Sequence, residues 1–274
     1  MRESYLACFP GGTSGRFILH VMWRIVTGQD YSIQFDEANS SHPESPWWSP
    51  YFEFPTIGPK SNMHRSQFFQ ALKLNEEEIG KYQMGFCHVF PDFDQLRIKA
   101  PDTKLVLVSY HYDNIVEIVT NNTRKNSAQL YVGNLIKDLI NDPLFKSLHY
   151  DDLKDYYNVY NIQSERLTDD FFNLVIDKRI KYIRQLFNED PFNGDNLTLD
   201  KIPEDFRNKT LILKYDDIFK KDDNEYIAIR KIENFLQKKI GPVTRQSYER
   251  YVTNRIINTI GTKSLTKTTN KYIL

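Results

Sequence analysis

The sequence predicts an α/β fold in which a parallel sheet is flanked by helices on both faces. Two observations predict it. Residues 104–110 form a near-continuous apolar run, which is typical of a strand that is covered on both faces. Short apolar runs also alternate along the chain with segments of helical periodicity, and this alternation favours a parallel sheet.

The chain opens with one such unit. Residues 5–9 are apolar and predict a buried strand, and a glycine-rich turn at 10–15 follows. Residues 15–27 then carry apolar side chains at helical spacing. Ser14 is a residue type that caps helices and Gly28 one that ends them, so we expect a helix between the two.

The remaining elements follow from shorter patterns. Asp113 is expected to cap a helix over 115–119. Residues 42–60 contain five prolines and are expected to form an irregular loop. We expect further strands at 31–35, 84–90 and 210–214, and further helices at 65–72, 75–82, 130–140, 150–162, 170–187 and 224–239. Residues 1–240 are interpreted as the α/β domain, and 241–274 as a basic helix and tail.

Composition excludes several classes of protein. Aromatic residues make up 14% of 274 residues, too many for a disordered chain. The 36 basic residues balance the 36 acidic ones, so we do not expect a protein that coats nucleic acid through its overall charge. We find no apolar run of about 18 residues that would span a membrane. The start lacks the apolar stretch of a secretory signal and there are two cysteines, Cys8 and Cys87, so we expect a cytoplasmic protein.

The zero net charge hides an uneven distribution. Residues 238–274 carry eight Lys or Arg against one acid, Glu249. This segment is either a solvated basic tail or a patch that meets phosphate or sulfate. Elsewhere, the adjacent Asp216 and Asp217 are interpreted as caps of a following helix rather than metal ligands.

The glycine-rich turn is suited to an anion. Glycines let backbone N–H groups converge, and the start of the following helix adds partial positive charge. The residues expected to bind the anion are Gly11, Gly12, Thr13, Ser14, Gly15 and Arg16. A Walker A loop would place a Mg²⁺-binding Ser or Thr where Phe17 stands, which disfavours a magnesium-dependent kinase.

Four segments in order make the chain resemble the sulfotransferases that use PAPS (3′-phosphoadenylyl sulfate). They lie between residues 5 and 240: the turn at 10–14, a strand end at 86–91 that holds His88, the strand and turn at 105–117, and the strand and turn at 211–218 with Phe235 and Leu236 after them. The resemblance implies a P-loop-like fold, with His88 as the catalytic base and with Ser109 and Asp113 near the 3′-phosphate of PAPS or of its product, PAP.

The chain also departs from that family's pattern. Pro10 stands where the family has a loop lysine, and Phe86 replaces a lysine near the base. Ser109 stands at the arginine of the 3′-phosphate segment and Glu117 at its serine. A carboxylate at that position would repel a phosphate. The family's C-terminal glycine- and lysine-bearing loop is not recognisable in this chain, although Arg245, Arg250 and Arg255 lie in that region.

Histidine chemistry supports the same interpretation. Sulfuryl transfer needs a base for the acceptor hydroxyl, and a histidine suits that task near neutral pH. His88 ends a strand next to the turn, and His111 is the runner-up base because it also follows a strand. His20 and Arg16 share one face of the first helix, which we interpret as solvated.

We therefore expect a sulfotransferase-like protein that acts on a hydroxyl-bearing small molecule or glycan, with PAPS as donor and no metal. Two alternatives stay open. The missing cations favour a catalytically inactive member of the same fold that serves as a binding or structural module. A divergent P-loop kinase is the third reading, which Phe17 disfavours.

Overall fold

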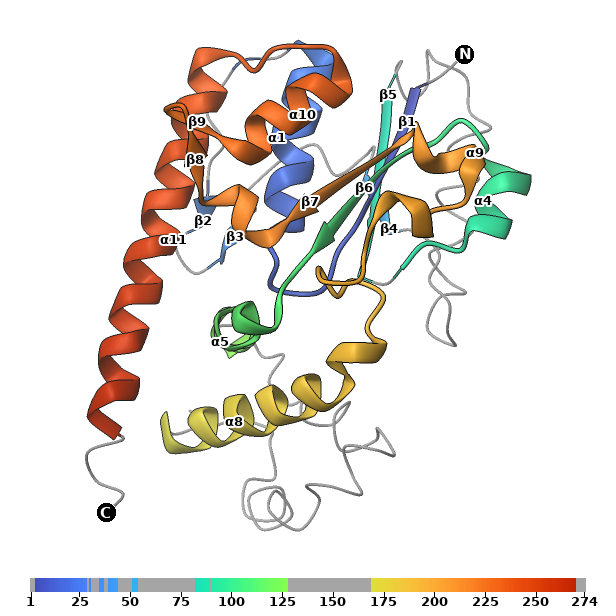
Figure 1. Cartoon of the computed structure of the whole chain (residues 1–274). Helices are drawn as coiled ribbons and strands as arrows, with labels where there is room; N and C mark the ends of the chain where they lie inside the picture. Colours follow the sequence, from blue (N-terminus) through green and yellow to red (C-terminus); the bar gives the residue numbers. More distant parts are fainter. Residues whose placement is uncertain are drawn as a thin grey trace.

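A computed structural model of the chain describes residues 3–28, 30, 35–36, 39–43, 51–53, 82–88, 90–127 and 169–269. Within these ranges the main sheet has five parallel strands in the order β4-β5-β1-β6-β7, with helices on both faces (Figure 1). The α/β class that the sequence predicts is therefore confirmed.

The first strand of the chain lies at the centre of this sheet. β1 pairs with β5 on one side and with β6 on the other, and the register places Cys8 opposite Cys87 and Leu107. β4 and β5 lie on one side of β1, and β6 and β7 lie on the other. The strands are β1 (Glu3–Cys8), β4 (Tyr51–Glu53), β5 (Tyr82–Cys87), β6 (Lys104–Ser109) and β7 (Thr210–Lys214).

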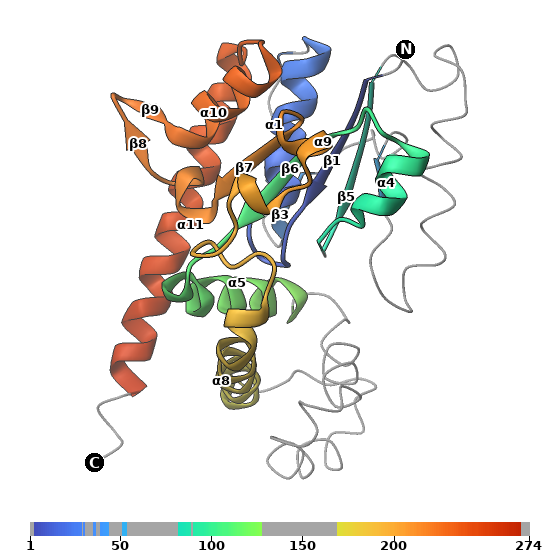
Figure 2. The same ribbon diagram turned by 45° about the vertical axis from the view of Figure 1, so that its right-hand side comes forward.

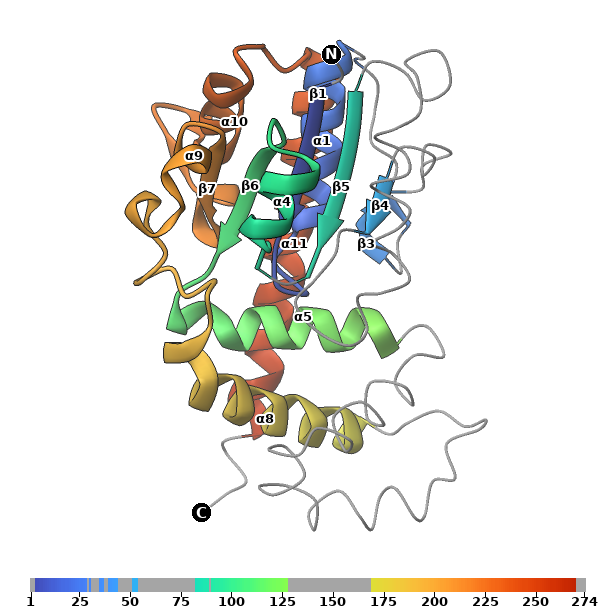
Figure 3. The same ribbon diagram turned by 90° about the vertical axis from the view of Figure 1, so that its right-hand side faces the viewer.

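Helices form a layer on each face, as Figures 2 and 3 show. One face carries α1 (Gly15–Thr27) and α10 (Ile227–Leu236), with α11 (Pro242–Thr269) packed outside α1. The other carries α4 (Phe93–Lys99) and α9 (Glu204–Arg207). Two further helices, α5 (Ile115–Ser127) and α8 (Asp169–Leu186), pack together beyond the carboxyl ends of the strands.

Short elements complete the described chain. Four are 3₁₀ turns: η2 (Tyr112–Asn114), η3 (Phe187–Glu189), η4 (Leu199–Lys201) and η5 (Tyr215–Ile218). Two small antiparallel pairs join β2 (Phe35–Asp36) to β3 (Asn39–Pro43) and β8 (Lys221–Asp222) to β9 (Glu225–Tyr226).

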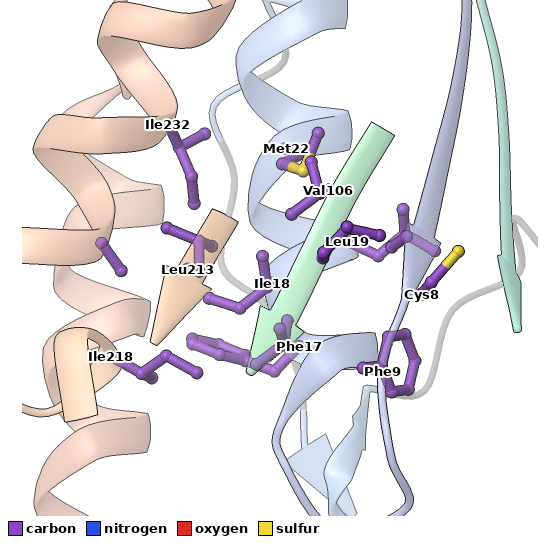
Figure 4. Close-up of a cluster of buried hydrophobic side chains, with 14 of the residues drawn as sticks. Cys8, Phe9, Phe17, Ile18, Leu19, Met22, Val106, Leu213, Ile218 and Ile232 are labelled. Carbon is purple, nitrogen blue, oxygen red and sulfur yellow. The ribbon is translucent and has the colours of Figure 1, made fainter. Parts of the chain in front are cut away.

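The core lies between α1, α10 and the sheet. Ile18 and Met22 of α1 lie close to Val106 of β6 and Leu213 of β7, and all four are fully buried (Figure 4). Each such side chain stabilises the fold by about 1.5–3 kcal/mol relative to exposure in water. This packing fixes α1, and with it the turn that precedes α1, against the middle of the sheet.

Several predicted elements match closely. The helix over 15–27 has the predicted bounds and ends at Gly28, which adopts a left-handed conformation. The strand over 210–214 also matches, and β6 is buried along its length as the apolar run predicts. The predicted strand at 84–90 is displaced toward the N-terminus, since β5 ends at Cys87.

Two local predictions are wrong. Residues 42–60 were expected to be irregular, but Tyr51–Glu53 form β4, which pairs with β5 as the outermost strand. Prolines are tolerated around an edge strand because one side of that strand needs no partner. Asp113 does not cap α5. It is exposed within η2, the turn that leads directly into α5, and His111 is the N-cap residue of η2, where its backbone N–H donates to Asn114 Oδ1 (2.9 Å).

The helices predicted at 65–72, 130–140 and 150–162 lie outside the described residues. The helix predicted at 75–82 also lies outside them, apart from Tyr82, which begins β5. The same holds for the strand predicted at 31–35, apart from Phe35, which begins β2.

Candidate functional site

The glycine-rich turn lies at the carboxyl end of the central strand. It leaves β1 after Cys8 and enters α1 at Gly15. The chain places later strands on both sides of β1, so this end of β1 is the point at which the strand order reverses. In open α/β sheets, ligands bind outside the carboxyl ends of the strands at such a point. The fold thus presents the turn where a ligand is expected.

The backbone of the turn alternates in hand. Gly12 has φ 92° and Ser14 has φ 63° and ψ 14°, so both residues are left-handed. Thr13 closes the turn between them, because its N–H and its hydroxyl both donate to the Pro10 carbonyl (3.3 and 2.7 Å). Alternating conformations of this kind make concave arrays of N–H groups that suit anions. The first N–H groups of α1 add to them, since they have no acceptor within the helix.

Ser14 occupies the capping position of α1 but does not cap the helix with its side chain. Its Oγ instead accepts a hydrogen bond from the Tyr251 hydroxyl of α11 (2.6 Å). A left-handed conformation costs a residue with a Cβ about 1–2 kcal/mol. The structure therefore holds Ser14 in a strained conformation at the centre of the predicted site.

His88 lies beside the turn, as the strand order predicts. Its Nδ1 is 3.2 Å from the Phe9 carbonyl oxygen, and its ring lies edge-on to the Phe9 ring with centroids 5.0 Å apart. A carbonyl can only accept, so Nδ1 is the donor and Nε2 carries the lone pair of the neutral ring. His88 is exposed. The ring is thus oriented with its basic nitrogen directed away from the strand end.

Arg16 lies on the same side of the turn. Its guanidinium carbon is 4.3 Å from the centroid of the Phe86 ring, the residue that stands where the resemblance implies a lysine. The phenyl face attracts the cation and holds it near the first turn of α1. Arg16 and His88 are therefore both located through Phe86, whose ring is 5.7 Å from that of His88.

The two residues expected at the 3′-phosphate lie in different environments. Ser109 is completely buried, and its hydroxyl donates to the Leu213 carbonyl of β7 (3.4 Å). Asp113 is exposed in η2. Glu117 accepts a hydrogen bond from the Tyr215 hydroxyl (2.7 Å), so its carboxylate is held by a neighbour in the protein.

The runner-up base, His111, has a carboxylate partner of its own. Its Nδ1 is 2.6 Å from Asp195 Oδ1, a pairing that fixes the ring and leaves Nε2 as the outer nitrogen. The ring also lies against the backbone at Gly194. These contacts tie His111 to the 193–196 turn rather than to the glycine-rich turn.

His20 contradicts its predicted environment. Its face of α1 was expected to be solvated, but His20 and Arg24 are both buried. Burial, reinforced by the charges of Arg24 and Arg16, lowers the pKa of His20 to about 3. The imidazole is therefore neutral at physiological pH. The spacing of His20 and Arg16 on one helical face suggested a solvated surface, but the folded chain buries His20 and Arg24 on α1.

The sequence analysis named Arg255 among the C-terminal cations but did not predict the contacts that α11 makes with the glycine-rich turn. Arg255 donates from its Nη2 to the Gly12 carbonyl (3.0 Å), and Tyr251 stacks on Phe17 at a centroid distance of 3.7 Å. Both are buried. A signal was present, because Tyr248, Tyr251, Val252 and Arg255 recur at the spacing of one helical face.

The charge of Arg255 is retained in this setting. Burial alone would lower the pKa of Arg255, but Tyr251, Tyr215 and Glu117 hold it above its ordinary value. Burial raises the pKa of Tyr215 well above its ordinary value, although Arg255 opposes the rise. Arg255 is therefore a permanent cation that contacts the predicted anion-binding turn.

No family model and no curated protein matches the chain. Among the described helices, none is long and apolar enough to cross a membrane.

Asp216 and Asp217 act as hydrogen-bond acceptors within and beyond their own turn. Asp217 Oδ2 accepts from the Lys214 N–H (2.9 Å) and from Lys231 Nζ (2.6 Å), and Asp216 Oδ1 accepts from Asn114 (2.8 Å). Within the part of the chain that the structure describes, no three His, Cys, Asp or Glu residues are grouped so as to hold a metal ion.

Proposed function

We propose that the chain is a sulfotransferase-like protein that moves a sulfuryl group from PAPS to the hydroxyl of a small molecule or glycan. One observation carries the proposal: the structure sets an oriented histidine, His88, directly beside the glycine-rich turn, through the 3.2 Å contact of its Nδ1 with the Phe9 carbonyl. A base and an anion-binding turn side by side are what this reaction requires.

The residues of the turn fit one end of the donor better than the other. The amides of the turn other than that of Thr13, which donates to Pro10, suit the 5′-phosphosulfate together with the Arg16 guanidinium, because backbone N–H groups and a cation stabilise spread negative charge. At the position implied for the 3′-phosphate, Ser109 and Glu117 are held by Leu213 and Tyr215. That end of the donor therefore lacks the cation that the resemblance implies at position 109.

Each residue has a defined part in the transfer. When bound, PAPS supplies the sulfuryl group, with PAP as the leaving group. His88 Nε2 accepts the proton of the acceptor hydroxyl as its oxygen bonds to sulfur, and later releases that proton to solvent. The turn amides and Arg16 stabilise the negative charge that develops on the leaving oxygen. The central position of β1 in the parallel sheet also supports a P-loop-like architecture.

Thermal unfolding in the presence of nucleotides tests the proposal. A ligand that binds only the folded state at 100 times its Kd stabilises that state by about 2.7 kcal/mol. We expect PAP to raise the Tm, and Mg-ATP to leave it unchanged. Stabilisation by Mg-ATP alone would favour the kinase alternative, and no response to PAP would refute the proposal.

A transfer assay distinguishes an active sulfotransferase from a catalytically inactive binding module of the same fold. Labelled sulfuryl transfer from PAPS to a panel of hydroxyl acceptors is expected for the enzyme. PAP binding without transfer to any acceptor would favour the inactive binding module, for which the residues at 10, 86 and 109 argue.

A further inference from the structure

A polar network of two buried side chains and one half-buried side chain connects three distant parts of the chain to the glycine-rich turn. The Tyr215 hydroxyl of η5 donates to Glu117 Oε1 of α5 (2.7 Å), and Arg255 of α11 hydrogen-bonds Tyr215 in turn. Arg255 also donates to the Gly12 carbonyl (3.0 Å). A carboxylate, a phenol and a guanidinium thus lead from α5 to the backbone of the turn.

Two residues of α11, one helical turn apart, hold the two left-handed residues of the glycine-rich turn. Arg255 contacts Gly12, which has φ 92°, and Tyr251 contacts Ser14, which has φ 63°. The peptide group between Gly12 and Thr13 is planar, so it is held at both ends: its oxygen by Arg255, its N–H by the Pro10 carbonyl. Binding sites gain affinity when such groups are fixed in advance.

Charge gives the network a second effect on the turn. The Arg255 cation attracts an anion at the turn, whereas the Glu117 carboxylate is attracted to Arg255 and offsets its field. Arg255 is buried and Glu117 is half-buried, so their effects are screened less than those of fully exposed charges. The position at which the sulfotransferase pattern has a neutral serine thus carries a counter-charge in this chain.

We propose that this network sets the anion affinity of the glycine-rich turn, with Arg255 as a positioning residue that strengthens binding and Glu117 as a counter-charge that restrains it. The inference rests on the proposed function, because it concerns the same turn. According to this proposal, residues of α11 and α5, and not only those of the turn itself, determine how tightly the turn binds an anion.

The sign of the Glu117 effect distinguishes this role from a merely structural one. Glu117→Gln keeps an oxygen that can accept from Tyr215 but removes the charge. We expect it to tighten PAP binding by about 3-fold to 10-fold, since the Arg255 field is no longer offset, while lowering the Tm. Loss of packing alone would lower affinity and stability together. Unchanged or weaker PAP binding by Glu117→Gln would overturn the proposal.

Arg255 is tested against an arginine on the same helix. Arg255→Met should weaken PAP binding by about 10-fold or more, because it removes both the hydrogen bond that holds the Gly12 carbonyl and the charge that attracts the anion. Arg250→Met, at an exposed position of α11, is the matched control and should change affinity less than 2-fold. If Arg255→Met does not fold, Arg255→Lys keeps the charge and should weaken binding to a smaller extent. Equal affinity of the Arg255 and Arg250 variants contradicts the role.

A readout without nucleotide keeps this inference separate from the proposed function. Amide hydrogen exchange at 11–15 should be faster in Arg255→Met and in Tyr251→Phe than in Arg250→Met, because the left-handed residues are no longer held. If the wild type fails to bind PAP but exchange responds in this way, the function is wrong and the positioning role stands. Unchanged exchange in both variants would remove α11 from the control of the turn.

Discussion

The aromatic ring of Phe9 occupies the space that a side chain at position 15 would fill. A Cβ placed on Gly15 would overlap the ring of Phe9, and that ring is buried and stacked on Phe86. Glycine is thus required at the junction of the turn and α1 by packing, in addition to any requirement of a ligand.

We therefore expect Gly15→Ala to destabilise the protein by about 3 kcal/mol or more, since overpacking a tight site forces the backbone to shift. Gly28→Ala is the matched control: its Cβ would meet nothing within 4 Å, and only its left-handed φ of 69° is unfavourable. That change should cost about 1 kcal/mol. Urea unfolding measures both, and equal costs would show that the Phe9 contact does not constrain position 15.

His88 should be needed for transfer and not for donor binding. We expect His88→Ala to lower the rate of sulfuryl transfer by about 100-fold to 10,000-fold, the range of a lost general base, with PAP affinity changed little. His111→Ala is the control, because His111 is tied to Asp195 and not to the turn. Rate assays and PAP titrations give the two values. Transfer that survives in His88→Ala but not in His111→Ala would reverse the assignment.

Arg16 should contribute to anion binding by its charge. Arg16→Met preserves much of the contact with Phe86 but removes the cation, and we expect PAP binding to weaken by about 10-fold. The effect should shrink as salt rises, because screening weakens electrostatic attraction. Calorimetric titration at two salt concentrations measures it, with Arg230→Met as control, since Arg230 pairs with Asp222 at the surface. An Arg16 effect no larger than the control would remove Arg16 from the site.

The buried His20 should make stability depend on pH. Its pKa is lowered to about 3 in the folded state, so the unfolded chain takes up a proton below about 6.5 and the folded chain does not. The stability present above pH 6.5 is then lost as pH falls toward 3, by up to about 1.4 kcal/mol per pH unit.

Comparison of wild type with His20→Gln at pH 7 and pH 5 checks this linkage. Between these values the wild type should lose about 2 kcal/mol more of its unfolding free energy than the variant, measured by urea unfolding at each pH. Parallel losses in the two proteins would mean that His20 gains a proton in the folded state.

The sequence predicted the elements that short residue patterns specify, such as an apolar run or a glycine at a helix end. The strand at 104–109 is apolar because both of its faces are covered, and α1 ends at Gly28 because a left-handed residue is needed there. β4 could not be predicted in this way, since three residues among prolines carry no periodicity and pair only because β5 offers an open edge.

The candidate site shows the same division. The position of His88 beside the turn follows from the parallel pairing of β1 and β5, which the sequence predicts. The contact of Arg255 with Gly12 does not follow from any neighbouring residue. A helix 243 positions away supplies it, and only the assembled fold shows which loop that helix meets.

This separation along the chain has a consequence for folding kinetics. Ordering a contact across 243 residues closes most of the polypeptide into one loop, and such closures carry a large entropic cost that is met late in folding. After dilution from denaturant, recovery of PAP binding should therefore lag behind recovery of the helical circular dichroism signal. The glycine-rich turn would then reach its final geometry only after the distant helix α11 has docked against it.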